Sequence, residues 1–288
     1  MPPRDVALAT LPPLLWAIAY TVAKPASAAF PPLLLISMAY AVTAFVLLTP
    51  WRPLRTPLWA VVVAGTFGAS LQSALIFSGI AQIPASMAIL VVQSQVPFAV
   101  LSVWAIGQEK IQIRRLAGIV LALAGVAMVV GLPDAAGNIR GSLLVVLGTV
   151  SWGIAQAVVR TFSRDSGARL MGAMSAVATP QLLAASFFLE KGQVEALTTA
   201  SVTDWFAFVV LAFGGFAGAY AIWYSLLLRY RVDQVAPFVL LMPVIGVLSS
   251  WILLDERPTL PTIGGGLVIL AGLAMVVVVS DAALRPKN

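Results

Sequence analysis

The chain has 288 residues, of which 60% are hydrophobic and only 10% are charged, and its mean hydropathy is +0.99. Soluble domains average about 25% charged residues, so a soluble protein is excluded and an all-α integral membrane protein is indicated. The net charge of +6 comes from basic residues scattered singly or in pairs. This distribution argues against a nucleic-acid partner and leaves the lipid bilayer as the main surrounding.

Neither cysteine nor histidine occurs in the sequence. Disulfides, thiolate metal sites and cysteine nucleophiles are therefore excluded, and the commonest general base and metal ligand is missing. We accordingly expect no metal site, no cofactor and no enzymatic activity.

Ten apolar segments follow one another between charged and proline-rich stretches, and each approaches the roughly 20 residues that a spanning helix needs. In chain order the predicted spans are residues 5–24, 31–50, 57–79, 84–106, 113–131, 140–160, 169–189, 205–228, 233–254 and 260–280. No basic leader with a cleavage site precedes the first segment, so we expect it to remain as a membrane helix.

The basic residues predict the orientation of these spans. If the N-terminus is cytoplasmic, only four of the 17 lysines and arginines fall on the opposite side: Lys24, Arg140, Lys191 and Arg257. This asymmetry follows the positive-inside rule. We therefore expect both termini to be cytoplasmic in a multi-pass protein of the bacterial inner membrane.

Aromatic and polar residues share one face of the first predicted span and of the sixth. Trp16, Tyr20 and Lys24 follow at four-residue steps, and Trp152 and Gln156 repeat that spacing. Aromatic residues often anchor a helix at the membrane interface. Trp16 and Trp152 lie near mid-span, however, where an indole N–H needs a polar partner, so we favour a place in the wall of a cavity.

Carboxamide side chains lie at membrane depth in the third, fourth and sixth spans: Gln72, Gln93, Gln95 and Gln156. Such groups are costly in lipid unless they hydrogen-bond across helices or face water. For each of them the sequence leaves both readings open, a structural hydrogen bond or contact with a polar substrate.

Prolines interrupt two of the predicted spans. Pro97 lies within the fourth, and Pro237 and Pro243 lie within the ninth. Proline removes a backbone hydrogen bond and kinks a helix, although membrane helices also tolerate it in a pure packing role. The equivalent places of Pro97 and Pro243 in the two halves favour hinges that gate a pathway.

The eighth span is rich in aromatic residues, namely Phe213, Phe216, Tyr220, Trp223 and Tyr224. Phe213, Phe216 and Tyr220 line up at three- and four-residue steps, and the last two continue the stripe. The stripe either faces lipid or forms a stacking wall for a planar ring, where each aromatic pair adds about 0.5–1.5 kcal/mol beyond burial.

Paired glycines, seven residues apart, occur in the fifth and tenth spans: Gly118, Gly125, Gly265 and Gly272. Small residues let helices approach closely, so these two spans are predicted to be packing elements or a dimer contact. Glu109 and Glu256 stand beside basic residues at span ends. That placement indicates a solvated cap or a salt bridge rather than a binding role.

The sequence repeats itself. Residues spread from Trp104 to Val130 recur 147 positions later, from Trp251 to Val277. We therefore predict one membrane transport domain, residues 1–288, made of two five-helix repeats over residues 1–134 and 135–288. Because five is odd, the second copy is inverted in the bilayer, as in secondary transporters.

Ordered motifs in both halves resemble those of a known family. The first half has Pro84-Ala-Ser-Met-Ala, Pro97, Glu109 and the stretch Gly118 to Gly125, and the second has Val232-Asp-Gln-Val-Ala, Pro243, Glu256, Gly265 and Gly272. With the tryptophans of the first and sixth spans, this order resembles the ten-span EamA-type branch of the drug/metabolite transporter superfamily. The chain is most similar to the aromatic amino-acid exporters of that branch.

The resemblance implies a secondary transporter that exports small metabolites, aromatic or other hydrophobic amino acids, through a central cavity by alternating access. A nucleotide-sugar or sugar-phosphate carrier is the alternative within the superfamily, but its cargo would want several buried cations, and only Lys24 and Arg160 approach the core. A membrane scaffold without transport is the alternative of another class.

The predicted partners are a small-molecule substrate and the bilayer, and the predicted assembly is a monomer or weak homodimer. Every acidic residue falls at or near the end of a span, so we expect flux driven by the solute gradient rather than by protons. The candidate substrate-binding residues are Trp16, Tyr20, Gln72, Gln93, Gln95, Trp152, Gln156, Phe216, Tyr220, Trp223 and Tyr224.

Overall fold

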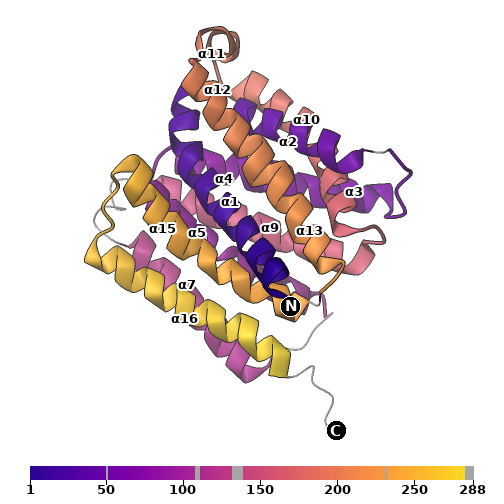
Figure 1. The fold of residues 1–288 in the computed structure, drawn as a ribbon, viewed down its shortest axis with the longest axis vertical. Coiled ribbons are helices and arrows are strands. Elements are labelled where there is room, and N and C mark those ends of the chain that lie inside the picture. The colour runs from indigo at the N-terminus through magenta and orange to yellow at the C-terminus, as the bar shows by residue number, and fades with distance from the viewer. Residues whose placement is uncertain (50, 108–110, 132–138, 231, 283–288) are drawn as a thin grey trace.

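The computed structural model describes residues 1–49, 51–107, 111–131, 139–230 and 232–282, and these residues form a bundle of helices (Figure 1). Within these ranges the regular structure is entirely helical. The helix α1 begins, and the helix α16 ends, at the same end of the bundle (Figure 1).

The elements of the first half are α1 (Pro3–Ala29), α2 (Pro32–Leu48), α3 (Leu58–Gly65), η1 (Thr66–Leu71), α4 (Gln72–Ile80), α5 (Ala85–Val92), α6 (Gln95–Ala105) and α7 (Ile113–Val130). Those of the second half are α9 (Ile139–Phe162), α10 (Gly167–Leu189), α11 (Gln193–Thr199), α12 (Val202–Val209), η2 (Val210–Gly218), α13 (Ala219–Leu227), α14 (Val232–Val235), η3 (Ala236–Leu240), α15 (Leu241–Leu254) and α16 (Leu260–Ala282).

The described residues contain nine helical stretches that are long and apolar enough to cross a membrane. A further apolar helix, α2, has 17 residues, the lower limit of the roughly 17–25 residues found in spanning helices. Together they coincide with the ten predicted spans. The short helix α11 between α10 and α12 was not predicted, because its seven residues carry no membrane-length apolar signal.

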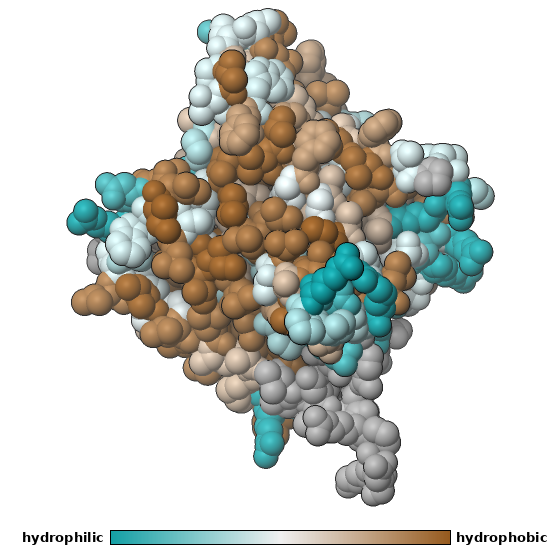
Figure 2. Space-filling view, viewed as in Figure 1, coloured by the Kyte–Doolittle hydropathy of each residue, from teal (hydrophilic) through white to brown (hydrophobic). Residues whose placement is uncertain are grey.

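Large apolar side chains cover the outside of the bundle. Phe45 is 76% exposed, Phe187 is 77% exposed and Leu267 is 62% exposed. Figure 2 shows hydrophobic side chains over the middle of one face of the bundle, with hydrophilic side chains mainly toward its margins. An apolar belt with polar ends is the surface that a bilayer requires, so the protein is a multi-pass membrane protein.

Two spans contain a π-helical segment at comparable positions in the two halves. The segment η1 lies between α3 and α4, and η2 lies between α12 and α13. A Cβ atom at Gly68 of η1 would lie 2.6 Å from the Cβ atom of Ala155 on α9, and a Cβ atom at Gly215 of η2 would collide with Ala19 on α1. Each π segment therefore crosses the first helix of the other half at close range. Segments of this kind are frequent at functional sites.

The spans that hold the predicted hinge prolines are broken just before the proline. In the fourth span α5 ends at Val92 and α6 begins at Gln95, two residues before Pro97. In the ninth span α15 begins at Leu241, two residues before Pro243. The residues before α15 form the 3₁₀ segment η3, which has Pro237 in its first turn. A hinge role for these prolines remains a prediction.

The helices α7 and α16 pack with their backbones in close contact. A Cβ atom at Gly118 would lie 2.8 Å from the carbonyl oxygen of Gly272, and one at Gly125 would lie 2.9 Å from the carbonyl oxygen of Gly265. The predicted packing role of the four glycines is confirmed. The contact lies within one chain, between the last helix of each half.

Three carboxylates of the second half accept hydrogen bonds from backbone N–H groups of the first half, two of them at the start of a helix. Both carboxylate oxygens of Glu190 accept hydrogen bonds from the backbone N–H groups of Leu33 and Leu34, at 2.8 and 3.2 Å. Glu256 does the same for Ala85 and Ser86, at 2.9 and 3.0 Å. The first N–H groups of a helix lack partners inside that helix and favour negative charge. Glu256 was predicted to be a solvated cap or salt bridge, and it instead caps the start of α5 in a partly buried position, while Glu109 lies outside the described residues.

The third carboxylate, Asp165, lies in the connection between α9 and α10. It accepts hydrogen bonds from the backbone N–H group of Thr56 at 2.8 Å and from the Thr56 hydroxyl at 2.7 Å. Burial alone would raise the pKa of Asp165, but these bonds, the N–H group of Arg55 and the charge of Arg169 outweigh it and hold the pKa below its usual range. The carboxylate therefore stays ionised and anchors the connection that leads into α3.

Candidate functional site

A small cavity lies between α1, α2, α4 and the η2–α13 span, and six aromatic side chains line it. They are Trp16, Tyr20, Tyr40, Phe77, Phe216 and Tyr220. We call it the aromatic cavity. Its volume is about 30 Å³, whereas pockets that hold small molecules measure about 300–1,000 Å³. The rings almost fill the cavity in this conformation, so a bound molecule requires them to move apart.

The rings that line the aromatic cavity contact one another across helices. Trp16 of α1 lies edge-on to Tyr220 of α13, with ring centroids 5.5 Å apart. Tyr40 of α2 lies edge-on to Phe216 of η2, at 5.2 Å. Phe77 of α4 is 6.3 Å from Phe216. Aromatic pairs prefer these edge-to-face and offset arrangements, so the cluster joins the helices of the cavity wall.

Neutral polar groups complete the wall. The Tyr40 hydroxyl and the Ser73 hydroxyl share a hydrogen bond of 2.7 Å, and Ser73 also donates to Gln72 Oε1 at 3.3 Å. The indole Nε1 of Trp16 is buried and has no hydrogen-bond partner among the described residues. A buried N–H without an acceptor is costly, so Trp16 offers a donor to whatever enters the cavity.

Side chains behind the wall hold the π segment η1 in place. Gln181 of α10 accepts a hydrogen bond from the Ser70 hydroxyl at 2.6 Å and donates one to the Thr66 hydroxyl oxygen at 2.9 Å. The Ser151 hydroxyl of α9 donates to the carbonyl oxygen of Phe67 at 2.6 Å. A π segment disturbs the regular backbone ladder, and these bonds stabilise it directly before Gln72.

Hydrogen bonds also fix the second part of α1, beyond the cavity. The Thr21 hydroxyl shares a hydrogen bond of 2.7 Å with the Ser249 hydroxyl of α15. One turn further along, the ammonium group of Lys24 donates to the carbonyl oxygen of Ile83, in the connection between α4 and α5. Lys24 is thus occupied at the end of the span and does not line the aromatic cavity.

The structure brings five of the predicted binding residues together around the aromatic cavity: Trp16, Tyr20, Gln72, Phe216 and Tyr220. Two more adjoin it, because Trp223 lies 5.6 Å from Trp16 and Tyr224 stacks on Tyr220 at 6.1 Å between ring centroids. The other four predicted residues are not part of the cavity lining: Gln93, Gln95, Trp152 and Gln156.

Gln93 has a structural task at the break between α5 and α6. The backbone N–H group of Gln93 bonds to the carbonyl oxygen of Leu90, as in a 3₁₀ turn. In a regular α-helix this N–H group would bond to the carbonyl oxygen of Ile89, which is therefore left without its backbone donor. The side-chain Nε2 of Gln93 donates to that oxygen at 3.2 Å, which favours the structural reading for this residue.

The prediction of one aromatic stripe along the eighth span was wrong for Phe213. Phe213 is 51% exposed on the outside of the bundle, whereas Phe216 and Tyr220 line the cavity. The reason is the π segment, whose wider turns break the α-helical spacing on which the stripe was based.

Sequence reasoning also missed part of the wall, namely Ala19, Tyr40, Ser73, Phe77, Leu211 and Gly215. Tyr40 is fully surrounded by protein, with 1% of its surface exposed, and it is the one tyrosine in the apolar second span. A tyrosine in such a span needs a partner for its hydroxyl, and that need was an available signal. The small residues gave no signal, because their role is to let α1 and η2 touch.

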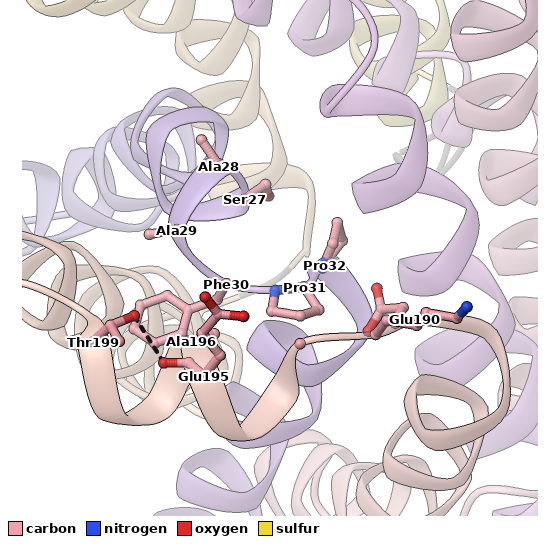
Figure 3. A pocket seen from close by; sticks show the side chains of 12 residues that line it. Ser27, Ala28, Ala29, Phe30, Pro31, Pro32, Glu190, Glu195, Ala196 and Thr199 are labelled. Atoms are coloured by element: carbon pink, nitrogen blue, oxygen red, sulfur yellow. Dashed lines mark hydrogen bonds between the residues drawn. The ribbon is translucent and has the colours of Figure 1, made fainter.

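A wider hollow of about 540 Å³ lies apart from the rings, between the α1–α2 turn and α11 (Figure 3). Glu190 and Glu195 both belong to its wall, and Figure 3 shows them on opposite sides of Pro31. Glu190 is engaged at the start of α2. The hollow shares no lining residue with the aromatic cavity, so we do not assign it to the same site.

Comparison with known proteins places the chain in a family. It matches the EamA-like transporter family over residues 5–131 and again over residues 139–278. The chain belongs to the EamA-like transporter family. Two matches in succession cover almost the whole of this EamA-like transporter, in line with the resemblance inferred from its motifs.

Several curated proteins are similar to this EamA-like transporter. A protein of Salmonella typhimurium described as a probable amino-acid metabolite efflux pump is 30% identical over 283 residues, covering 94% of this chain and 93% of the relative. A protein of Escherichia coli with the same description is 30% identical over 281 residues, with the same shares covered. A solved crystal structure with 22% identity superposes with a TM-score of 0.68 over 96% of this chain and 99% of that one.

Proposed function

We propose that this protein is a secondary transporter that exports small metabolites, aromatic or other hydrophobic amino acids, by alternating access at the aromatic cavity. The observation that carries the proposal is the wall of six rings from four spans around one cavity. A planar or apolar side chain fits between such rings by burial and by edge and face contacts. The similarity to proteins described as amino-acid metabolite efflux pumps supports the same cargo class.

The proposal includes an inverted repeat of residues 1–134 and 135–288, with both termini in the cytoplasm. Matched irregularities support the repeat, because η1 and η2 interrupt corresponding spans and Pro97 and Pro243 follow corresponding breaks. Inverted halves exchange their conformations when one bundle rocks against the other around a fixed site. The nearly filled cavity of about 30 Å³ fits an occluded conformation in this cycle.

The proposed location is a bacterial inner membrane, and the proposed assembly is a monomer or weak homodimer. The location follows the bacterial origin of the amino-acid efflux relatives and the excess of basic residues on one side of the predicted spans. The glycines of α7 and α16 already pack these two helices against each other within one chain. They are therefore not available for a close helix contact between two chains.

We expect the purified protein in liposomes to exchange labelled tryptophan and phenylalanine for the unlabelled amino acid, with saturable kinetics. The rings provide burial for an aromatic side chain, whereas the described cavity wall has no basic group for a phosphate. Counterflow in liposomes measures this, with alanine, glutamate and a nucleotide sugar as competing cargoes and protein-free liposomes as the control. If only the nucleotide sugar is exchanged, the cargo class proposed here is wrong and the protein is a nucleotide-sugar carrier. If none of the compounds is exchanged, a membrane scaffold without transport is favoured.

Tryptophan flux down its own gradient is expected to be unchanged by a proton uncoupler. Proton-coupled carriers keep an ionisable residue along the path, and the described residues that line the aromatic cavity include no carboxylate. The measurement is the initial rate of tryptophan efflux from liposomes at a fixed tryptophan gradient, with and without the uncoupler. An obligatory pH gradient would contradict gradient-driven export.

A further inference from the structure

The aromatic cavity poses an electrostatic problem for an amino acid. Such a cargo carries an ammonium and a carboxylate group, and isolated charges are very costly to bury without partners. The described lining of the cavity contains no aspartate, glutamate, lysine or arginine. An ion pair with the protein therefore cannot hold either end of the cargo at this wall.

Ring faces are the partners that the wall does provide for a cation. The face of an aromatic ring carries negative electrostatic potential and attracts an ammonium group within about 6 Å, most strongly for tryptophan. Trp16 and Tyr220 stand 5.5 Å apart at an interplanar angle of 62°, and Phe216 and Tyr220 stand 6.3 Å apart at 67°. In such an edge-to-face pair one ring covers the face of the other, so a ring face becomes available to a cation when the rings move apart to admit the cargo.

The opposite end of the cargo finds hydrogen-bond donors. Trp16 Nε1 is buried without an acceptor among the described residues. In the same wall Ser73 donates to Gln72 Oε1 and shares a hydrogen bond with Tyr40, which leaves the Nε2 group of Gln72 as the further donor. Neutral N–H groups of this kind can hold a carboxylate without bringing a countercharge.

We infer that the aromatic cavity holds the cargo's ammonium group on ring faces, without a carboxylate partner, and its carboxylate on neutral donors. The cavity then selects molecules that carry both charges and are neutral overall. Because ring faces need no N–H from the cation, the same site takes amino acids whose nitrogen is permanently trimethylated. This inference rests on the proposed transport function and adds the way in which the charged ends are recognised.

The test uses the full-length protein in liposomes, with labelled tryptophan and its Nα-trimethyl betaine as separate cargoes. We expect saturable exchange of both, with rates within about threefold of each other, and no exchange of N-acetyltryptophan, which carries only the negative charge. Exchange of tryptophan without exchange of the betaine would overturn the inference, because the ammonium would then depend on donating hydrogen bonds. Absence of exchange of tryptophan itself would instead overturn the proposed function.

Two substitutions at Tyr220 distinguish the effect of the aromatic ring on transport from the effect of its hydroxyl group. Tyr220→Phe keeps a ring face and is expected to keep betaine flux within about threefold, whereas Tyr220→Leu is expected to reduce it about tenfold. Phe213→Leu on the exposed side of η2 is the matched control and should leave the flux unchanged. Equal betaine flux in the Phe and Leu variants would overturn the inference. If Tyr220→Leu does not fold, Phe216→Leu tests the neighbouring ring in the same way.

Discussion

Tyr220→Ala is expected to reduce saturable tryptophan flux at least about tenfold, while Phe213→Ala leaves it unchanged. Tyr220 contacts Trp16 at 5.5 Å, Phe216 at 6.3 Å and Tyr224 at 6.1 Å between ring centroids. Tyr220→Ala removes one ring contact with the cargo, worth about 0.5–1.5 kcal/mol beyond burial, together with the apolar burial that the ring gives the cargo, and a total of about 1.4 kcal/mol already corresponds to a tenfold change. Initial rates of counterflow in liposomes measure the effect.

Phe213 is a suitable control because it lies in the same span but is 51% exposed outside the bundle. Both variants remove one aromatic ring from the eighth span, so an effect of ring removal alone would appear in both. Size-exclusion elution and thermal unfolding of the detergent-purified variants establish that they remain folded. Equal flux in the two folded variants would mean that Tyr220 is not in contact with the cargo.

Gly272→Leu is expected to lower stability strongly, whereas Gly264→Leu has little effect. A Cβ atom at Gly272 would lie 2.7 Å from both the carbonyl oxygen of Gly118 and the Cα atom of Ala122. These are backbone atoms of α7 and cannot turn aside as a flexible side chain could. Forcing extra atoms into a tight contact costs about 1–3 kcal/mol, and occasionally more.

The matched control lies on the same helix, since a Cβ atom at Gly264 would meet nothing within 4 Å. Both changes remove a helical glycine and add an identical side chain, so helix propensity and hydrophobicity cancel in the comparison. Thermal unfolding monitored by tryptophan fluorescence in detergent measures the difference. Equal midpoints for the two variants would show that α7 and α16 do not pack as described.

The sequence predicts best those features whose physical signal adds up over many residues. Hydropathy summed over about 20 residues located every span to within a few residues, because the bilayer demands that each one be continuously apolar. The paired glycines likewise predicted that α7 and α16 are close-packing helices, and the structure shows that their partners are each other. Both are properties of a whole segment or of a repeated spacing, and neither depends on the detailed course of a helix.

The candidate site was predicted only in part, because it depends on helix irregularities. The segments η1 and η2 shift the direction of every side chain that follows them, and no spacing rule for a regular helix anticipates the shift. Phe213 was therefore placed with Phe216, and Tyr40 and Phe77 of two other spans were missed. Trp152 carries the same local motif as Trp16, yet only Trp16 lines the aromatic cavity.

The three carboxylates that bind backbone N–H groups of another segment all lie in the second half of the chain. Asp165, Glu190 and Glu256 belong to residues 135–288, while the backbone groups that they hold, from Leu33 to Ser86, belong to residues 1–134. Residues 1–134 and 135–288 are thus joined by hydrogen bonds to ionised carboxylates as well as by apolar packing, and such bonds are roughly twice as strong as those between neutral groups.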